Sequence, residues 1–401
     1  MYKKRYLTNT LCYVGVNDRT KHLFENMWPL PYGVSYNSYL ILDKKTALID
    51  TVDCCYSEEF IKNIEATLDG RPLDYLIVNH MEPDHSGSIA ALLRIYPNVT
   101  LVGNAKTFNM IEGFYGNLTS NRLEVREKEM LSLGMHNLCF YTAPMVHWPE
   151  VMFTYDETDK ILFSADAFGC YGALNGGITD TQMNTDWYWD EMERYYANIV
   201  GKYGNPVQKA LCKLADVEIK MICSTHGPVW IENIPKVVAT YDRMSRYEGM
   251  EGVTIVYGSM YGNTAAMAES LANALAEQGV RNIAVHNVSV SHPSYILRDL
   301  FRYKGIIIGS PTYCGSLYPE IESLLEKIKI RDLKNRSYAC FGSFSWAGMA
   351  AKSLLAFGES MKWQIVGEPV ENKMSLQAEK QVLLEKLAED MAKAIKPSCN
   401  N

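Results

Sequence analysis

The sequence contains no uninterrupted apolar run near the roughly 18 residues that a membrane-spanning helix needs. The first ten residues, MYKKRYLTNT, carry basic side chains but no apolar stretch, so no secretory signal is expected. The ten cysteines include no Cys-x-x-Cys pair, which argues against a rubredoxin-type, zinc-ribbon or iron–sulfur module within the chain. Scattered cysteines of this kind predict a cytoplasmic protein with reduced thiols.

An excess of positive charge is also missing. The 39 lysines and arginines are outnumbered by 46 aspartates and glutamates, which gives a formal net charge of −7. We therefore expect neither general nucleic-acid binding nor attachment to an anionic membrane. The length of 401 residues, with 47% hydrophobic and 21% charged residues, predicts two or three ordinary globular domains.

The first 250 residues mix strand and helix patterns. Short alternating runs over 10–50 predict antiparallel strands, and residues 57–68 predict a helix that ends before Gly70. The apolar run 73–78 predicts a buried strand. Further strands are expected near 98–102, 121–125, 129–133, 137–142, 151–155, 160–164 and 219–223, and helices near 186–201, 205–215 and 233–246.

The pattern changes after the charged, glycine-containing stretch 246–252, which predicts a hinge between domains. Strands and helices then alternate strictly: strands at 253–257, 283–288, 305–309 and 337–342, and helices at 263–278, 293–301, 319–328, 347–357 and 376–394. This alternation is typical of a doubly wound parallel sheet. We expect one domain over 1–250 and a second over 251–401.

The stretch NHMEPDHSGS, residues 79–88, has the densest set of metal-capable side chains. It places His80, Glu82, Asp84 and His85 on the turn between the strand 73–78 and a following helix. A tight turn directs successive side chains toward one point. Two imidazoles and two carboxylates form a nitrogen and oxygen set that suits iron, manganese or zinc.

Three further ligand types follow predicted strand ends: His147, Asp166 and His226. Together with the 79–88 stretch they supply seven nitrogen and oxygen ligands, which is what two adjacent metal ions need, with a carboxylate to bridge them. We expect the other four histidines, His22, His136, His286 and His292, to be ordinary surface or structural residues.

A second site is predicted in the C-terminal half. The loop GSMYGNT, residues 258–264, joins a strand to a helix, where backbone N–H groups and hydroxyls can surround a phosphate. It lacks the Gly-Lys-Ser/Thr of a nucleoside-triphosphate loop, so a monophosphate is expected. Two more loops after parallel strands, 309–316 and 341–349, are placed to hold a flat ring.

The order of the seven ligands resembles that of the metallo-β-lactamase superfamily, except that Glu82 stands where that family has histidine. An anionic oxygen ligand there shifts the preference from zinc toward iron. Joined to a flavodoxin-like domain, the pattern resembles the flavodiiron proteins over essentially the whole chain. The resemblance implies an α/β chain: a metallo-β-lactamase-like αββα sandwich followed by a flavodoxin-like doubly wound parallel sheet.

The same resemblance implies the site residues and cofactors. His80, Glu82 and His147 would bind one iron and Asp84, His85 and His226 the other, with Asp166 as the bridge. Glu82 and Asp166 would help to hold both irons with open positions facing the substrate. FMN would be held by Ser259, Met260, Tyr261, Gly262, Asn263, Thr264, Pro311, Thr312, Tyr313, Cys314, Gly315, Ser343, Phe344, Ser345, Trp346, Ala347 and Gly348.

The implied activity is the reduction of dioxygen to water, of nitric oxide to nitrous oxide, or of both. Electrons would come from an external donor such as rubredoxin or a reduced deazaflavin. A head-to-tail homodimer, or a dimer of such dimers, would bring the FMN of one chain to the metals of the other. The alternatives are a dinuclear zinc hydrolase with an appended flavodoxin domain, and a non-catalytic electron carrier.

Overall fold

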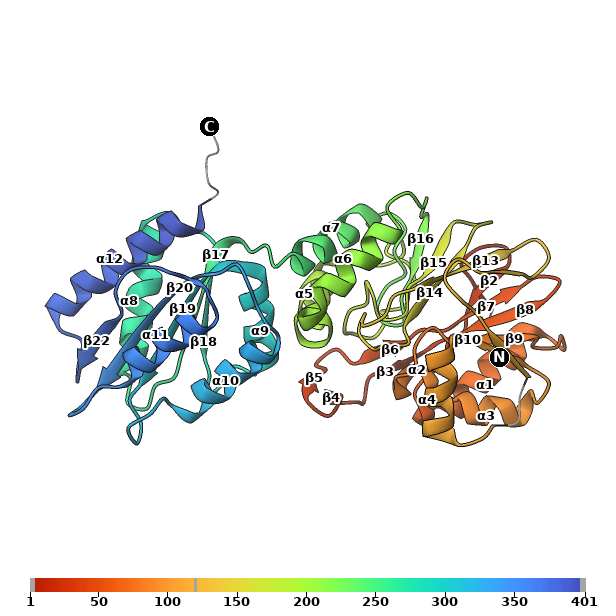
Figure 1. The fold of residues 1–401 in the computed structure, drawn as a ribbon, viewed down its shortest axis with the longest axis horizontal. Helices are drawn as coiled ribbons and strands as arrows, with labels where there is room; N and C mark the ends of the chain where they lie inside the picture. Colours follow the sequence, from red (N-terminus) through yellow and green to blue (C-terminus); the bar gives the residue numbers. More distant parts are fainter. Residues whose placement is uncertain (1–3, 119–120, 397–401) are drawn as a thin grey trace. The chain divides into compact units, whose positions relative to one another are not determined.

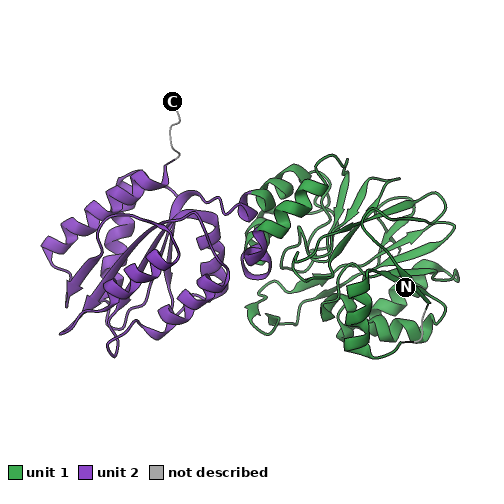
Figure 2. Ribbon diagram, in the orientation of Figure 1, with its two compact units in different colours: residues 1–195, 205–242 green, residues 196–204, 243–401 purple. Residues whose placement is uncertain are grey.

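The computed structural model describes residues 4–118 and 121–396 of the chain. These residues divide into two compact units, which Figure 2 shows in different colours. Unit 1 comprises residues 1–195 and 205–242, and unit 2 comprises 196–204 and 243–401. The expected domain boundary after residue 250 stays a prediction.

Unit 1 contains two large sheets (Figure 1). The first has the strand order β1-β2-β7-β8-β9-β10-β11, antiparallel from β1 to β8 and parallel from β8 to β11. Its strands are β1 (Arg5–Tyr6), β2 (Leu11–Tyr13), β7 (Tyr39–Leu42), β8 (Thr46–Ile49), β9 (Tyr75–Ile77), β10 (Thr100–Gly103) and β11 (Asn121–Glu124).

The second sheet has the order β12-β13-β14-β15-β16 and is antiparallel except for the last pair. Its strands are β12 (Met130–Ser132), β13 (Asn137–Thr142), β14 (Met152–Asp156), β15 (Ile161–Phe163) and β16 (Met221–Cys223). Two small ribbons pair β3 (Val16–Asp18) with β6 (Val34–Tyr36), and β4 (Leu23–Phe24) with β5 (Trp28–Pro29).

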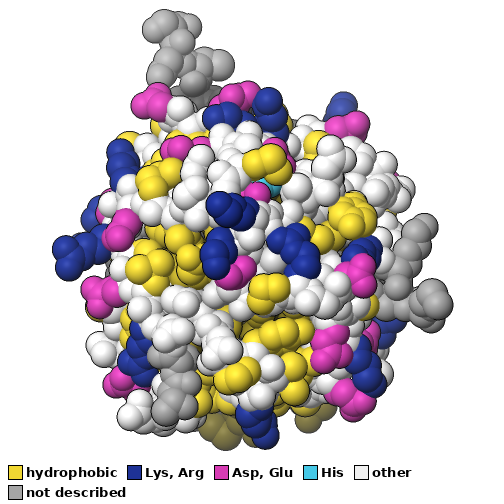
Figure 3. Space-filling view, turned by 90° about the vertical axis from the view of Figure 1, so that its right-hand side faces the viewer, with side chains coloured by type: hydrophobic (Ala, Val, Ile, Leu, Met, Phe, Trp, Pro, Cys, Tyr) yellow, Lys and Arg dark blue, Asp and Glu magenta, His cyan; other side chains and the backbone are white. Residues whose placement is uncertain are grey.

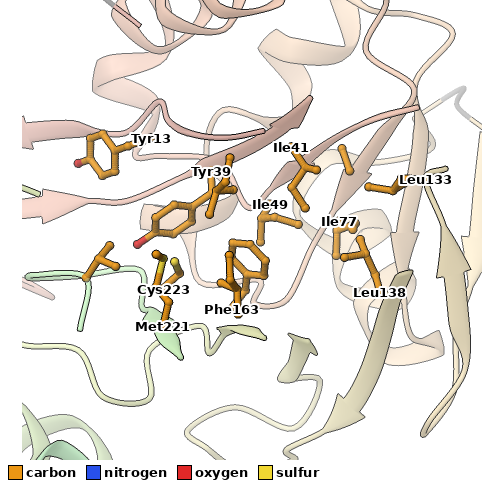
Figure 4. Close-up of a cluster of buried hydrophobic side chains, with 14 of the residues drawn as sticks. Tyr13, Tyr39, Ile41, Ile49, Ile77, Leu133, Leu138, Phe163, Met221 and Cys223 are labelled. Atoms are coloured by element: carbon orange, nitrogen blue, oxygen red, sulfur yellow. The ribbon is translucent and has the colours of Figure 1, made fainter. Parts of the chain in front are cut away.

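Apolar side chains from the two sheets meet in one core (Figure 4). Tyr39, Ile49 and Ile77 come from the first sheet, and Leu138 and Phe163 come from the second. Helices α1 (Ser57–Leu68), α3 (Ile89–Ile95) and α4 (Ala105–Tyr115) lie on the side of the first sheet, and α6 (Gly204–Lys213) and α7 (Ile234–Ser245) lie on the side of the second (Figure 1). The unit is therefore the αββα sandwich that the sequence predicts.

The predicted helix 186–201 is helical over its whole length but changes type after Tyr195. Helix α5 spans Asp186–Tyr195, and the chain then widens into a π-helical turn, Tyr196–Val200, and a short 3₁₀ turn, Gly201–Tyr203. Arg331 of unit 2 explains the change, because its guanidinium donates to the carbonyls of Ala197 (2.9 Å) and Asn198 (3.2 Å). Carbonyls that bond a distant arginine leave the regular pattern of an α-helix.

Unit 2 has a parallel sheet of order β18-β17-β19-β20, with β21 and β22 both beside β20. This is the doubly wound order of flavodoxin-like folds. Its strands are β17 (Met250–Tyr257), β18 (Ile283–Asn287), β19 (Tyr303–Pro311), β20 (Ser337–Phe344), β21 (Gln364–Ile365) and β22 (Val370–Lys373). Its helices are α8 (Asn263–Glu277), α9 (Pro293–Arg302), α10 (Pro319–Ile330), α11 (Ala350–Ser360) and α12 (Ala378–Ile395).

Two expected boundaries shift in unit 2. The predicted hinge 246–252 overlaps the start of β17 at Met250, and α11 begins at Ala350 rather than at residue 347. The latter change arises because the Thr312 hydroxyl accepts from the N–H groups of Met349 (2.9 Å) and Ala350 (3.1 Å) and so caps the helix there.

The described residues show mixed surface charge, free cysteines and no membrane-spanning helix. Acidic and basic side chains are interspersed over the face in Figure 3. The nine cysteines within the described residues are free thiols, and Cys399 lies outside those residues. None of the described helices is both long enough and apolar enough to cross a bilayer.

Candidate metal centre and flavin-binding loops

The predicted metal ligands lie where strands of both sheets of unit 1 end. The 79–88 stretch follows β9 and includes the short helix α2 (Pro83–Ser86). Asp50 fixes this turn, because its Oδ1 accepts from the N–H groups of Asn79 (2.7 Å) and His80 (3.3 Å). From the second sheet, His147 precedes β14, Asp166 follows β15 and His226 follows β16.

The structure brings all seven predicted ligands together in two buried groups. His80, Glu82, His147 and Asp166 form one group and Asp84, His85 and His226 the other, with ligand atoms within 4.8 Å of one another in each. Asp166 Oδ2 lies 3.1 Å from His147 Nε2, while Oδ1 lies 2.9 Å from His85 Nε2. One carboxylate therefore faces both groups, as a bridging ligand must.

Several of these atoms have no hydrogen-bond partner among the described residues: the Nε2 atoms of His80, His85 and His226, and both carboxylate oxygens of Asp84. Burying such groups without partners costs several kcal/mol each. Metal ions would satisfy them, and imidazole with carboxylate is a donor set that iron accepts. The residues thus fit two adjacent iron ions.

The charges in the two groups reinforce one another. Burial alone would lower the pKa of the histidines, but the neighbouring carboxylates outweigh it and raise the pKa of His85 and His147 to about 9. The histidines in turn hold the pKa of Glu82 and Asp166 below its usual range, against the effect of burial. The carboxylates are therefore ionised and ready to bind cations, which would displace the imidazole protons.

Sequence reasoning missed the groups that orient the ligands. His80 Nδ1 donates to Glu150 Oε1 (2.8 Å), which also accepts from the Met81 N–H (2.9 Å). His226 Nδ1 donates to the Ser35 carbonyl (2.7 Å). These bonds leave each Nε2 free to face the metal. By contrast, His85 Nδ1 has no such partner within the described residues.

We expect Glu150→Gln to weaken iron binding about tenfold, the lower end of the effect of losing an orienting carboxylate. The amide keeps the size of the side chain but removes the charge that orients His80. Iron retained against a chelator measures the effect. Glu127→Gln is the control, because Glu127 bonds Thr142 and Lys213 instead of a ligand. Equal retention in the two variants would contradict the role of Glu150.

Tyr195 is a second residue that the sequence did not reveal. Its ring lies 5.6 Å from that of His226, and its hydroxyl has no hydrogen-bond partner among the described residues. Burial, and then the charges of Asp166, Glu82 and Asp84, raise the pKa of this phenol well above its usual value. The hydroxyl of Tyr195 therefore stays protonated, on a ring that lies beside His226. A tyrosine in a predicted helix gives no sequence signal of that role.

The three predicted loops of unit 2 meet around one cavity at the carboxyl ends of β17, β19 and β20. The cavity is lined by Ser259, Met260, Tyr261, Asn263, Thr264, Pro311, Thr312, Ser343, Phe344 and Ser345. Gly262, Tyr313, Cys314, Gly315, Trp346, Ala347 and Gly348 lie in the same loops but do not line it.

The residues of these loops suit a phosphate and a flat ring. Ser259 Oγ accepts from the N–H groups of Gly262 (3.2 Å) and Ala265 (3.4 Å) at the start of α8. These amides therefore point to a position where an oxygen atom of a phosphate would bind. Tyr261 and Trp346, which are 90% and 89% exposed, stand beside the cavity. Large exposed aromatics at a cavity mark a binding surface for an apolar ring.

Comparison with known proteins agrees with the two-part fold. The family model described as ODP family beta lactamase matches residues 34–227, and the flavodoxin model matches 255–381. The nitric oxide reductase of Moorella thermoacetica is 31% identical over 366 residues, which is 90% of this chain and 91% of that protein. This chain is a flavodiiron protein.

Other flavodiiron relatives are similar over most of their length. An anaerobic nitric oxide reductase flavorubredoxin of Escherichia coli is 33% identical over 326 residues, 80% of this chain and 68% of that protein. The solved structure of rubredoxin oxygen:oxidoreductase from Desulfovibrio gigas has a TM-score of 0.93 and 28% identity, and covers 98% of each chain. The cofactors of this flavodiiron protein are FMN and two iron ions, and the zinc hydrolase is not favoured.

Proposed function

We propose that this flavodiiron protein reduces dioxygen to water, nitric oxide to nitrous oxide, or both. The observation that supports this most is Asp166, whose two carboxylate oxygens face two separate groups of buried ligands. The names of the Moorella and Desulfovibrio relatives, which specify nitric oxide and oxygen respectively, support the two substrates.

The proposed ligand sets are those implied by the sequence: His80, Glu82 and His147 for one iron, and Asp84, His85 and His226 for the other, with Asp166 shared. When bound, FMN supplies electrons one or two at a time, and the iron pair supplies open positions for a diatomic gas. Glu82 and Asp166 supply negative charge that favours iron over softer metals. His85 is the weakest ligand of the set, because its Nδ1 lacks an orienting partner.

Aromatic side chains beside the metal groups would supply a proton and limit the access of water. The raised pKa keeps the Tyr195 phenol protonated, and its ring lies 5.6 Å from that of His226, so we propose it as a proton donor to the reduced gas. Phe24 and Tyr171 pack with Tyr195 at centroid distances of 6.1 and 5.0 Å, and Phe24 also contacts the His226 ring. This aromatic wall limits the access of water to the centre.

The loops that we assign to FMN are 258–264, 311–315 and 343–348. Ser259 and the first amides of α8 would hold the phosphate, and Trp346 would cover the ring. We further propose a cytoplasmic protein, an external donor such as rubredoxin or a reduced deazaflavin, and a head-to-tail homodimer or a dimer of such dimers.

Parallel steady-state assays of purified protein with dioxygen and with nitric oxide test the function, using one artificial donor and measuring iron, zinc and FMN. We expect about two irons and one FMN per chain and turnover of at least one gas. Active protein that contains only zinc, or iron-loaded protein that reduces neither gas, would refute the proposal.

A further inference from the structure

An apolar cavity of about 500 Å³ opens in unit 1 between the end of α6, helix α7 and β16. Leu211, Leu214, Ile222, Ile234 and Val238 supply much of its lining, and Asp242 is the one ionisable residue on its wall. Leu211, Ile234 and Val238 are half-buried, so the cavity is an apolar groove that is open to solvent.

A second, much smaller cavity of about 10 Å³ shares part of its lining with the first. Phe168, Leu211 and Leu214 line both cavities, and we call these three shared side chains the constriction. The inner cavity is also lined by Val146 and Ala167, whose neighbours in the chain are the predicted ligands His147 and Asp166.

Tyr241 also lines the inner cavity. It is fully buried, and the charge of Asp166 contributes, after burial, to raising the pKa of its phenol. The Phe168 and Tyr241 rings lie 4.7 Å apart. Part of the lining of the inner cavity therefore adjoins His147 and Asp166 in the chain.

We propose that these two cavities are the entry path for the apolar diatomic substrate. The inner cavity is lined almost entirely by apolar side chains, which favour an apolar gas over water because water finds few hydrogen-bond partners there. The inference rests on the proposed function and adds to it the route of the gas and the three residues, Phe168, Leu211 and Leu214, that control it.

Leu214→Trp tests the path by filling the constriction. We expect kcat/KM for the gas to fall about tenfold, because this ratio depends on the rate at which gas molecules reach the metal centre. The kcat at saturating gas and the iron and FMN contents should not change. Cys212→Trp is the matched control, because Cys212 is exposed on the same segment and lines neither cavity. If Leu214→Trp does not fold, Ala210→Leu narrows the inner cavity with fewer added atoms.

Xenon provides an independent test of the path without a variant. Crystals of the holoprotein under xenon pressure should show the atom between Leu211, Leu214 and Phe168, because dry apolar cavities take up xenon. Unchanged kcat/KM in a folded, filled variant, or no xenon at the constriction, would overturn the path. Wild-type protein that reduces neither gas would instead overturn the proposed function, and the xenon result would still stand by itself.

Discussion

Asp166→Asn is expected to lower the iron content from about two per chain to one or less and to reduce gas turnover at least about 100-fold. The asparagine has nearly the same size, but it offers one neutral oxygen in place of two charged ones. Since Oδ1 faces His85 and Oδ2 faces His147, both metal positions lose an anionic ligand together. Elemental analysis and steady-state turnover measure the two effects.

The matched control for Asp166→Asn is Asp156→Asn. Asp156 is also buried and also pairs with a histidine, His136, at 2.7 Å. Its histidine bonds Thr10 through the other ring nitrogen, and among the described residues His136 and Asp156 belong to neither group of metal ligands. The control should therefore keep its iron and FMN. If Asp166→Asn retains two irons and full turnover, the shared carboxylate is not a bridge.

Two inactive variants are expected to restore activity when they form a mixed dimer. The metal groups belong to unit 1 and the flavin-binding loops to unit 2, so each can be disabled separately. Ser259→Asp puts a carboxylate at the amides where the phosphate would bind, and it should exclude FMN by charge repulsion. Asp166→Asn disables the metal centre of the other chain.

In a head-to-tail dimer the flavin site of one chain serves the metal centre of its partner, so a mixed dimer has one complete pair out of two. Its turnover should be about half that of the wild-type dimer, while each variant homodimer stays inactive. Two affinity tags isolate the mixed species, and cofactor analysis verifies it. A mixed dimer that has bound cofactors at its intact sites but no turnover would show that each chain works alone.

Much of the fold follows from local pattern. Helix α1 has the bounds that the sequence predicted, Ser57–Leu68, because its apolar residues recur at helical spacing and glycine follows it. The strict alternation after residue 253 was sufficient to predict a parallel doubly wound sheet, since parallel strands need a crossover helix. Ligand-type residues directly after strands predicted both sites, because strand ends bring distant turns to one edge of a sheet.

The sequence by itself determined which seven side chains could bind metal and which three loops could hold a flavin. Only the tertiary structure decided that Asp166 faces both ligand groups, that Glu150 orients His80, and that the Tyr195 ring lies beside that of His226. It also decided that residues 196–204 leave α5 to pack within unit 2. These features depend on contacts between residues far apart in the chain, and such contacts impose no periodicity or spacing on the sequence.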